Sequence, residues 1–287
     1  MADITLSASV RSNLLSLGKT TDLINKTQTR LATGLSVASP IDDAVAYFQS
    51  KALNDRAADF EEKKSGIDQG ISTLKTALTA VDAIDKMVKQ MKGLVLSAKS
   101  ATDTEKGDLQ EQFNDLAVQI NELANDASYQ GLNLVNSTAA KLTVNFSETS
   151  TAKLEVEGVE LNASILLTAA GGAASVIASL LVGDDWSDIG ASEVSDFEAA
   201  IDELDNALTT LRGNAKTLGS NVAVLQTRLD FTKSYSNNLT EGAGKLNLAD
   251  LNEEGANLVA LQTRQQLGMQ ALQFAGTAEQ AVLQLFR

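Results

Sequence analysis

The chain has 287 residues, of which 44% are hydrophobic, and it carries a formal net charge of −14. It contains no cysteine and no histidine, which excludes thiolate nucleophiles, disulfides, zinc sites with nitrogen or sulfur ligands, and imidazole acid–base chemistry. The acidic balance argues against a nucleic-acid partner, because phosphates attract a surplus of Lys and Arg.

The N-terminus predicts an amphipathic helix over residues 10–31. No cationic stretch followed by an apolar one precedes it, and no apolar run approaches a membrane span, so we expect no cleaved signal peptide and no membrane partner. Such a chain is usually cytosolic, although a dedicated secretion machine would also need no cleavable leader. The helix keeps a mostly apolar seam at alternating steps of four and three: Val10, Leu14, Leu17, Thr21, Ile24, Gln28 and Leu31.

A connector follows this helix. Gly34 is placed to end the helix in a left-handed conformation. Ser39 is a favoured N-cap, Pro40 then takes the first helical position, and Asp42 comes three residues after the cap, so a new helix is predicted to start here. Asp42 and Asp43 would both lie in the first turn, pointing about 100° apart, which disfavours a shared metal or acid–base site. The stretch therefore predicts a change of chain direction.

Two further helices follow, and Tyr47 and Phe48 near the start of the first are expected to be core residues. Each helix has one apolar seam with the same four-three spacing. The first seam comprises Ile67, Ile71, Leu74, Leu78, Val81, Ile84, Val88, Met91 and Val95. The second comprises Leu109, Phe113, Leu116, Ile120, Leu123 and Ala127.

Residues 138–192 differ from the helical sequence around them. Leu142, Val144 and Phe146 alternate with polar residues, as do Leu154 and Val156, so we expect a β-hairpin with a loop of four to six residues. Gly-, Ser- and Asp-rich loops then surround a short apolar segment, residues 175–182. The acidic stretch 184–186 only loosely resembles a calcium loop and is expected to be a solvated loop.

The longest seam starts at Phe197 and continues to Leu246 without a slip in its four-three spacing. It predicts one continuous helix of seven heptads, roughly 75 Å long. Its members are Phe197, Ile201, Leu204, Leu208, Leu211, Ala215, Leu218, Val222, Leu225, Leu229, Thr232, Ser236, Leu239, Ala243 and Leu246.

The C-terminal residues predict a helix that is apolar on more than one face. One stripe comprises Leu267, Ala271, Phe274, Ala278, Ala281 and Leu285, and a second comprises Leu258, Leu261, Leu272, Val282 and Phe286. The charges of residues 1–40 and 250–287 together sum to zero, so the whole −14 lies in the middle of the chain. A single pair of helices cannot bury stripes on several faces, so we expect the ends to self-associate.

These elements predict a mainly α fold: a long antiparallel coiled-coil-like bundle with paired N- and C-terminal helices and a small β-hairpin insertion. We expect three regions. Residues 1–39 and 248–287 form the terminal pair, 40–137 and 193–247 the bundle, and 138–192 an outward-facing excursion. The polymerisation interface is expected at Val10, Leu14, Leu17, Ile24, Leu31, Leu258, Leu261, Leu267, Leu272, Phe274, Val282, Leu285 and Phe286. The connector is expected at Gly34, Ser39, Pro40, Asp42 and Asp43.

Four segments, taken in order, resemble bacterial flagellin over nearly the whole length. RLATGLSVASPIDDAVAYF is similar to that family's RLSSGLRI followed by NSAKDDAAG, and DQGISTLKTAL to NDGISLLQTAEGAL. INELANDASYQGLNLV resembles the segment ending TQFNGVKLL, and LGMQALQFAGTAEQAVLQLF resembles a shortened form of the family's C-terminal segment. Each motif is weak alone, and their order in a cysteine-free chain makes the combination specific.

The resemblance implies a short-form subunit of the flagellar filament, with paired termini in the inner tube and the insertion facing outward. It implies an extracellular protein, exported through the flagellar type III apparatus without leader cleavage. The implied partners are other copies of the chain, a chaperone at the C-terminus, and the cap and hook-associated proteins.

Two departures from the family pattern carry expectations. Gln90 and Gly93 occupy the positions of an Arg and a Glu that the family presents to a vertebrate innate receptor, so we expect weak activation of that receptor. Ile41 replaces a Lys at the connector, which removes a charge.

Three alternatives remain open at this point. A hook-associated junction protein shares both terminal helices. A cytoplasmic coiled-coil adaptor would explain the heptads but not the charge-poor ends. An enzyme would depend on carboxylates alone, and we expect no catalytic, cofactor or metal site.

Overall fold

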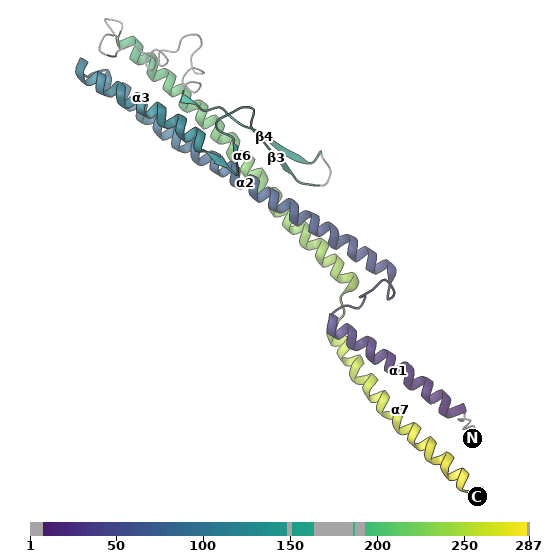
Figure 1. Ribbon diagram of the computed structural model, residues 1–287. Helices are drawn as coiled ribbons and strands as arrows, with labels where there is room; N and C mark the ends of the chain where they lie inside the picture. Colours follow the sequence, from purple (N-terminus) through teal and green to yellow (C-terminus); the bar gives the residue numbers. More distant parts are fainter. Residues whose placement is uncertain (1–7, 148–150, 164–185, 187–192, 286–287) are drawn as a thin grey trace. The chain divides into compact units, whose positions relative to one another are not determined.

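The computed structural model describes residues 8–147, 151–163, 186 and 193–285 (Figure 1). The chain divides into two compact units. The terminal unit contains the chain up to Ala57 and from Asn237 onward, and the bundle unit is Ala58–Ser236. Within the described ranges, no helix is both long and apolar enough to cross a membrane.

The bundle unit is built from α2 (Ala44–Ala98), α3 (Asp103–Asp126) and α6 (Glu193–Asn247), of which α2 and α6 continue into the terminal unit. Lys99 Nζ lies 2.7 Å from Glu198 Oε1, and Lys92 pairs with Asp205, so α2 and α6 run antiparallel. The helix predicted from Phe197 to Leu246 is confirmed as one continuous helix.

The predicted seams form the core of this unit. Every residue of the three seams is buried or half-buried, and the seam residues up to Leu229 pack into one hydrophobic cluster with the hairpin. The completely buried members include Ile67, Leu74, Ile84, Val88, Met91, Val95, Phe113, Ile120, Leu204, Leu211 and Leu225. Burying a large apolar side chain stabilises a fold by about 1.5–3 kcal/mol, so the three packed seams are the main source of the bundle unit's stability.

The predicted β-hairpin is confirmed. Strands β3 (Lys141–Asn145) and β4 (Lys153–Glu157) pair antiparallel, with Leu142 opposite Val156. The hairpin lies against α2 at Gly70, where a Cβ atom would come 2.6 Å from Val144 Cγ2. Gly70 therefore permits a close approach that a larger residue would prevent.

A second, shorter hairpin was not predicted. Strands β1 (Ser128–Tyr129) and β2 (Leu132–Asn133) are joined by Gln130 and Gly131, whose φ angles are 51° and 83°. Two left-handed residues in a row are the geometry of a tight hairpin turn. The Gln-Gly pair was the available signal, and it is weaker than the Asn-Gly pair that usually marks such turns.

Trp186 corrects part of the prediction that residues 184–186 form a solvated loop, and residues 184 and 185 lie outside the described residues. Its side chain is completely buried between Phe113 and Phe197, with ring centroids 5.6 Å and 5.7 Å away. Its backbone N–H donates to Gln110 Oε1 at 3.1 Å. The apolar segment predicted at residues 175–182 lies outside the described residues. The bundle is thus closed at this point by an aromatic side chain from the excursion.

The predicted fold class is confirmed: the structure is mainly helical, with long paired helices and a small hairpin.

Candidate functional site: the terminal helix pair and its connector

The terminal unit is built on an antiparallel pair of helices, α1 (Ala8–Thr33) and α7 (Leu251–Leu285). Their register is fixed at separate points. Gln265 Nε2 donates to Thr21 Oγ1 at 3.4 Å, and Arg30 Nη1 donates to Glu254 Oε1 at 2.7 Å. The pairing is therefore partly polar, unlike the seam of the bundle.

The predicted interface residues fall into two groups. Those facing the partner helix are already buried or half-buried in the single chain: Val10, Leu17, Ile24, Leu31, Leu258, Leu261 and Leu272. Leu14, Leu267 and Phe274 remain 44%, 60% and 74% exposed. The side chains of Val282 and Leu285, and all of Phe286, lie outside the description. The helix pair thus satisfies one face of each helix and leaves another open.

Further exposed apolar residues were missed by the sequence reasoning. Leu15, Leu23, Leu251, Val259 and Met269 are large and exposed on α1 or α7. These residues lie between or beside the predicted stripes, and the prediction considered only residues with four-three spacing. Considering every apolar residue on each helix would have found them.

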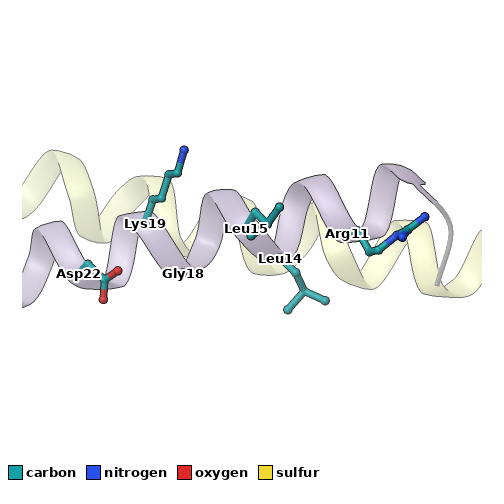
Figure 2. Close-up of a pocket in the computed structure, with 6 residues that line it drawn as sticks. All are labelled: Arg11, Leu14, Leu15, Gly18, Lys19 and Asp22. Carbon is teal, nitrogen blue, oxygen red and sulfur yellow. The ribbon is translucent and has the colours of Figure 1, made fainter. Parts of the chain in front are cut away.

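Figure 2 shows part of this open surface on α1, where Leu14, Leu15 and Gly18 lie between Arg11 and Lys19. Apart from its chain neighbours and the backbone of its own helix, Gly18 has no described heavy atom within 4 Å of where a Cβ would lie, and a shallow apolar depression is left there. A depression of this kind can accept a side chain from another molecule.

The end of α1 is tied to the link between α6 and α7. Gly34, with φ of +72°, donates its N–H to Arg30 O at 2.8 Å and ends α1 as predicted. Leu35 then pairs with Leu248 in an isolated antiparallel bridge, and the N–H of Ser36 donates to Asn247 O at 2.8 Å. The connector therefore has a defined hydrogen-bonded structure.

The predicted helix start at Ser39 is wrong. Helix α2 begins at Ala44, and Asp43 is the residue that caps it, its Oδ1 accepting from the N–H groups of Val45 (2.9 Å) and Ala46 (3.0 Å). Ser39 and Asp42 instead close a turn: Asp42 N–H donates to Ser39 O at 3.1 Å. Proline is favoured both at the second position of a turn and at the first position of a helix, so the local sequence was compatible with either structure at Pro40.

The two connector carboxylates act separately. The Ser39 hydroxyl donates to Asp42 Oδ2 at 3.1 Å, and this bond, followed by the nearby Lys26 ammonium, lowers the pKa of Asp42. Asp43 is engaged with the backbone of α2. In the part of the chain that the structure describes, no three acidic side chains lie close enough to hold a metal ion.

The first turns of α2 correct another prediction. Phe48 was expected in the core, yet its side chain is exposed, with the ring of half-buried Tyr47 5.5 Å away. Val45 is exposed too, and Ile41, where the resembling family has a lysine, is 95% exposed. The apolar residues of this stretch suggested burial, but no other described element covers this face of α2, so their side chains stay exposed.

Two family models match the chain. "Bacterial flagellin N-terminal helical region" matches residues 5–140, and "Bacterial flagellin C-terminal helical region" matches residues 201–286. The two matches contain α1 to α3 at one end, and α7 with most of α6 at the other.

Relatives match over almost the full length. Flagellin FljO of Caulobacter vibrioides is 30% identical over 282 residues, covering 96% of this chain and 94% of the relative. A flagellin of Brucella melitensis is 27% identical over 297 residues and covers 100% of both chains. Each match thus spans nearly the whole of both chains.

A solved structure shares the fold. It is described as a putative flagellar hook-associated protein from Vibrio parahaemolyticus, with a TM-score of 0.56 and 17% identity. The match covers 72% of this chain and 100% of that one.

Proposed function

The chain belongs to the bacterial flagellin family, as a short form, and we propose that it polymerises into the flagellar filament through the open faces of α1 and α7. The chain is a structural subunit of the filament, and its family is structural rather than enzymatic. The route of assembly, through these helices, is the proposal.

The observation that carries the proposal is the exposure of large apolar residues on both terminal helices. Phe274, Leu267, Val259 and Leu15 are all more than half exposed. Each would contribute about 1.5–3 kcal/mol if fully buried against another subunit. Repeated along a filament, such contacts couple the ordering of the ends to assembly.

The three regions expected from the sequence take corresponding roles in this proposal. Residues 1–39 and 248–287 line the inner tube, and 40–137 with 193–247 form the surrounding shell. Residues 138–192 face outward. The connector, with its paired backbone at Leu35 and Leu248, joins the first region to the second.

Export and handling of the monomer are part of the same proposal. The subunit leaves the cell through the flagellar type III apparatus and adds beneath the cap, beyond the hook-associated proteins. A chaperone covers the C-terminal helix before export. The exposed Leu267 and Phe274 on α7 support this step, since uncovered apolar surface promotes premature association.

The hook-associated interpretation rests on the fold alone, because the solved structure of that description is only 17% identical. The family models and the full-length relatives are flagellins. The same findings favour a flagellin over a cytoplasmic coiled-coil adaptor.

Deletion of residues 1–39 tests the proposal. The full chain is expected to form filaments at high concentration, visible by electron microscopy, while the truncated chain stays a soluble helical monomer because α7 has lost its partner. Circular dichroism of both proteins controls for folding of the bundle. Filaments formed by the truncated chain would show that α1 is not required.

A further inference from the structure

A groove runs between α1 and α7 near the connector end of the terminal unit. Its lining residues are Leu23, Lys26, Thr27 and Arg30 of α1, with Glu254, Asn257, Ala260, Leu261 and Arg264 of α7. Thr27 and Glu254 are buried, whereas Arg264 is exposed. The groove thus has a polar, partly buried floor and an open upper edge.

Positive charge exceeds negative charge in this groove. Three cations, Lys26, Arg30 and Arg264, face a single carboxylate, Glu254. Arg30 is paired with Glu254 at 2.7 Å, and Lys26 lies 3.4 Å from Asp42 of the connector. Arg264 has no ion pair with any described residue, so at least one positive charge stays unmatched.

Donor groups are also unused. The Nε atom of Arg30 is buried and has no acceptor among the described residues. Lys26 keeps half of its side chain exposed beside its one carboxylate contact. A buried donor without an acceptor costs about 1–3 kcal/mol, so an incoming acceptor would be stabilised there.

We propose that this groove binds a carboxylate side chain of a second copy of this chain, with Arg264 as its principal partner. The inference rests on the proposed function, because it assigns one contact within the polymer. The apolar residues Leu23, Ala260 and Leu261 would pack against the methylene stem of the incoming side chain.

The charge distribution of the chain favours a second copy as the occupant. The bundle unit, residues 58–236, contains 27 carboxylates against 14 cations, whereas the terminal unit has ten against nine. Neighbouring copies therefore present many carboxylates and few competing cations. A planar guanidinium can bind a carboxylate through two parallel hydrogen bonds, which fixes geometry as well as charge.

Such a contact chiefly fixes how one copy is positioned against the next. Charged contacts at an interface steer encounter and set register, while the apolar faces supply most of the affinity. Loss of the contact is therefore expected to weaken polymerisation without abolishing it.

The experiment measures the critical concentration for polymerisation of the full chain at about 0.05 M and 1 M NaCl. Arg264→Gln is expected to raise the critical concentration roughly fivefold at low salt and less than twofold at high salt. At high salt, screening already weakens the carboxylate contact in the unmodified chain, so its loss has less effect. Lys51→Gln, the same change of charge at an exposed residue of the terminal unit outside the groove, is the matched control and is expected to change it less than twofold. Circular dichroism of each monomer confirms that the variants fold.

The outcomes separate this inference from the proposed function. An unchanged critical concentration for Arg264→Gln, or an increase of equal size at both salt concentrations, overturns the carboxylate contact alone. An unmodified chain that never forms filaments overturns the proposed function, and this inference with it.

Discussion

The bundle unit and the terminal unit differ in how they bury their apolar residues. In the bundle unit, three helices and a hairpin enclose one cluster whose central side chains have no exposed surface. In the terminal unit, α1 and α7 pack against each other, yet Phe274 keeps 74% of its side chain exposed.

The difference follows from the number of helices available to each apolar stripe. Each helix of the bundle has one seam and two neighbours in the cluster, so its seam is covered within the chain. The terminal helices have apolar residues on several faces and one described partner each. Under the proposed function, the bundle unit folds alone and the terminal unit is completed by neighbouring subunits.

The largest effect is expected from truncating the bundle core at Phe113. Phe113→Ala should lower the free energy of unfolding of the monomer by about 3–5 kcal/mol, because it leaves a cavity beside Trp186. Urea unfolding followed by circular dichroism measures this, with the exposed Val118 of the same helix as the control through Val118→Ala. A loss below about 1 kcal/mol would mean that this core can rearrange without cost.

The next effect concerns the terminal unit. Phe274→Ser should leave the unfolding of the monomer within about 0.5 kcal/mol of the unmodified chain, since the side chain is exposed. It should raise the critical concentration for polymerisation by about ten- to a hundredfold, because burial of a Phe is lost at the interface. Sedimentation of filaments measures this, and Phe274→Leu, which stays apolar, serves as the control. Equal sedimentation of the Ser variant would place Phe274 outside the interface.

A smaller effect is expected at two glycines of α2. Gly70→Ala should destabilise the monomer by about 1–2 kcal/mol, because the new Cβ meets Val144 Cγ2 and must displace the hairpin. Gly66→Ala, one turn earlier with nothing within 4 Å, should stabilise the same helix by up to about 1 kcal/mol. Thermal unfolding of the two variants compares them directly. Stabilisation by both changes would show that the hairpin yields at no cost.

The smallest effect is the response to acid. The backbone N–H and the hydroxyl of Thr102 lower the pKa of Glu105 from its ordinary value of 4.5, and Lys64 does the same for Glu61. A lowered pKa contributes stability that is present above the unfolded value and lost as the pH falls through the folded value. With no histidine in the chain, monomer stability is expected to be flat near neutral pH and to decline below about pH 4.5.

Glu105→Gln provides the control for that titration. The variant should reduce the acid-dependent part of the decline slightly, because one of the shifted carboxyls is absent. Unfolding curves collected between pH 3 and pH 8 would show this. A marked loss of stability between pH 6 and pH 8 would contradict the assignment of the pH dependence to carboxylates.

Sequence patterns predicted the parts of the fold that depend on long periodic segments. The seam from Phe197 to Leu246 and the alternation in the hairpin both follow from repeated spacing, which tolerates an error at one residue. The end of α1 at Gly34 was predictable for a different reason, because few residues other than glycine adopt a positive φ.

The remaining features depend on choices between local alternatives or on tertiary contacts. Ser39 and Asp43 are both good helix caps, and only the structure shows that Asp43 is used. Trp186 lies in a polar stretch, and its burial depends on Phe113 and Phe197, which are distant in sequence. The exposure of Phe48 likewise reflects the absence of a covering element among those described, which no local pattern encodes.

Hydrogen exchange on monomer and filament tests the central claim most directly. In the monomer, amides of the bundle seams should be protected while those of α1 and α7 exchange readily, since the terminal helices lack their second partners. In the filament, α1 and α7 should gain protection of at least about a hundredfold, and the bundle seams should change little. Equal protection of α1 and α7 in both states would contradict the view that assembly completes the terminal unit.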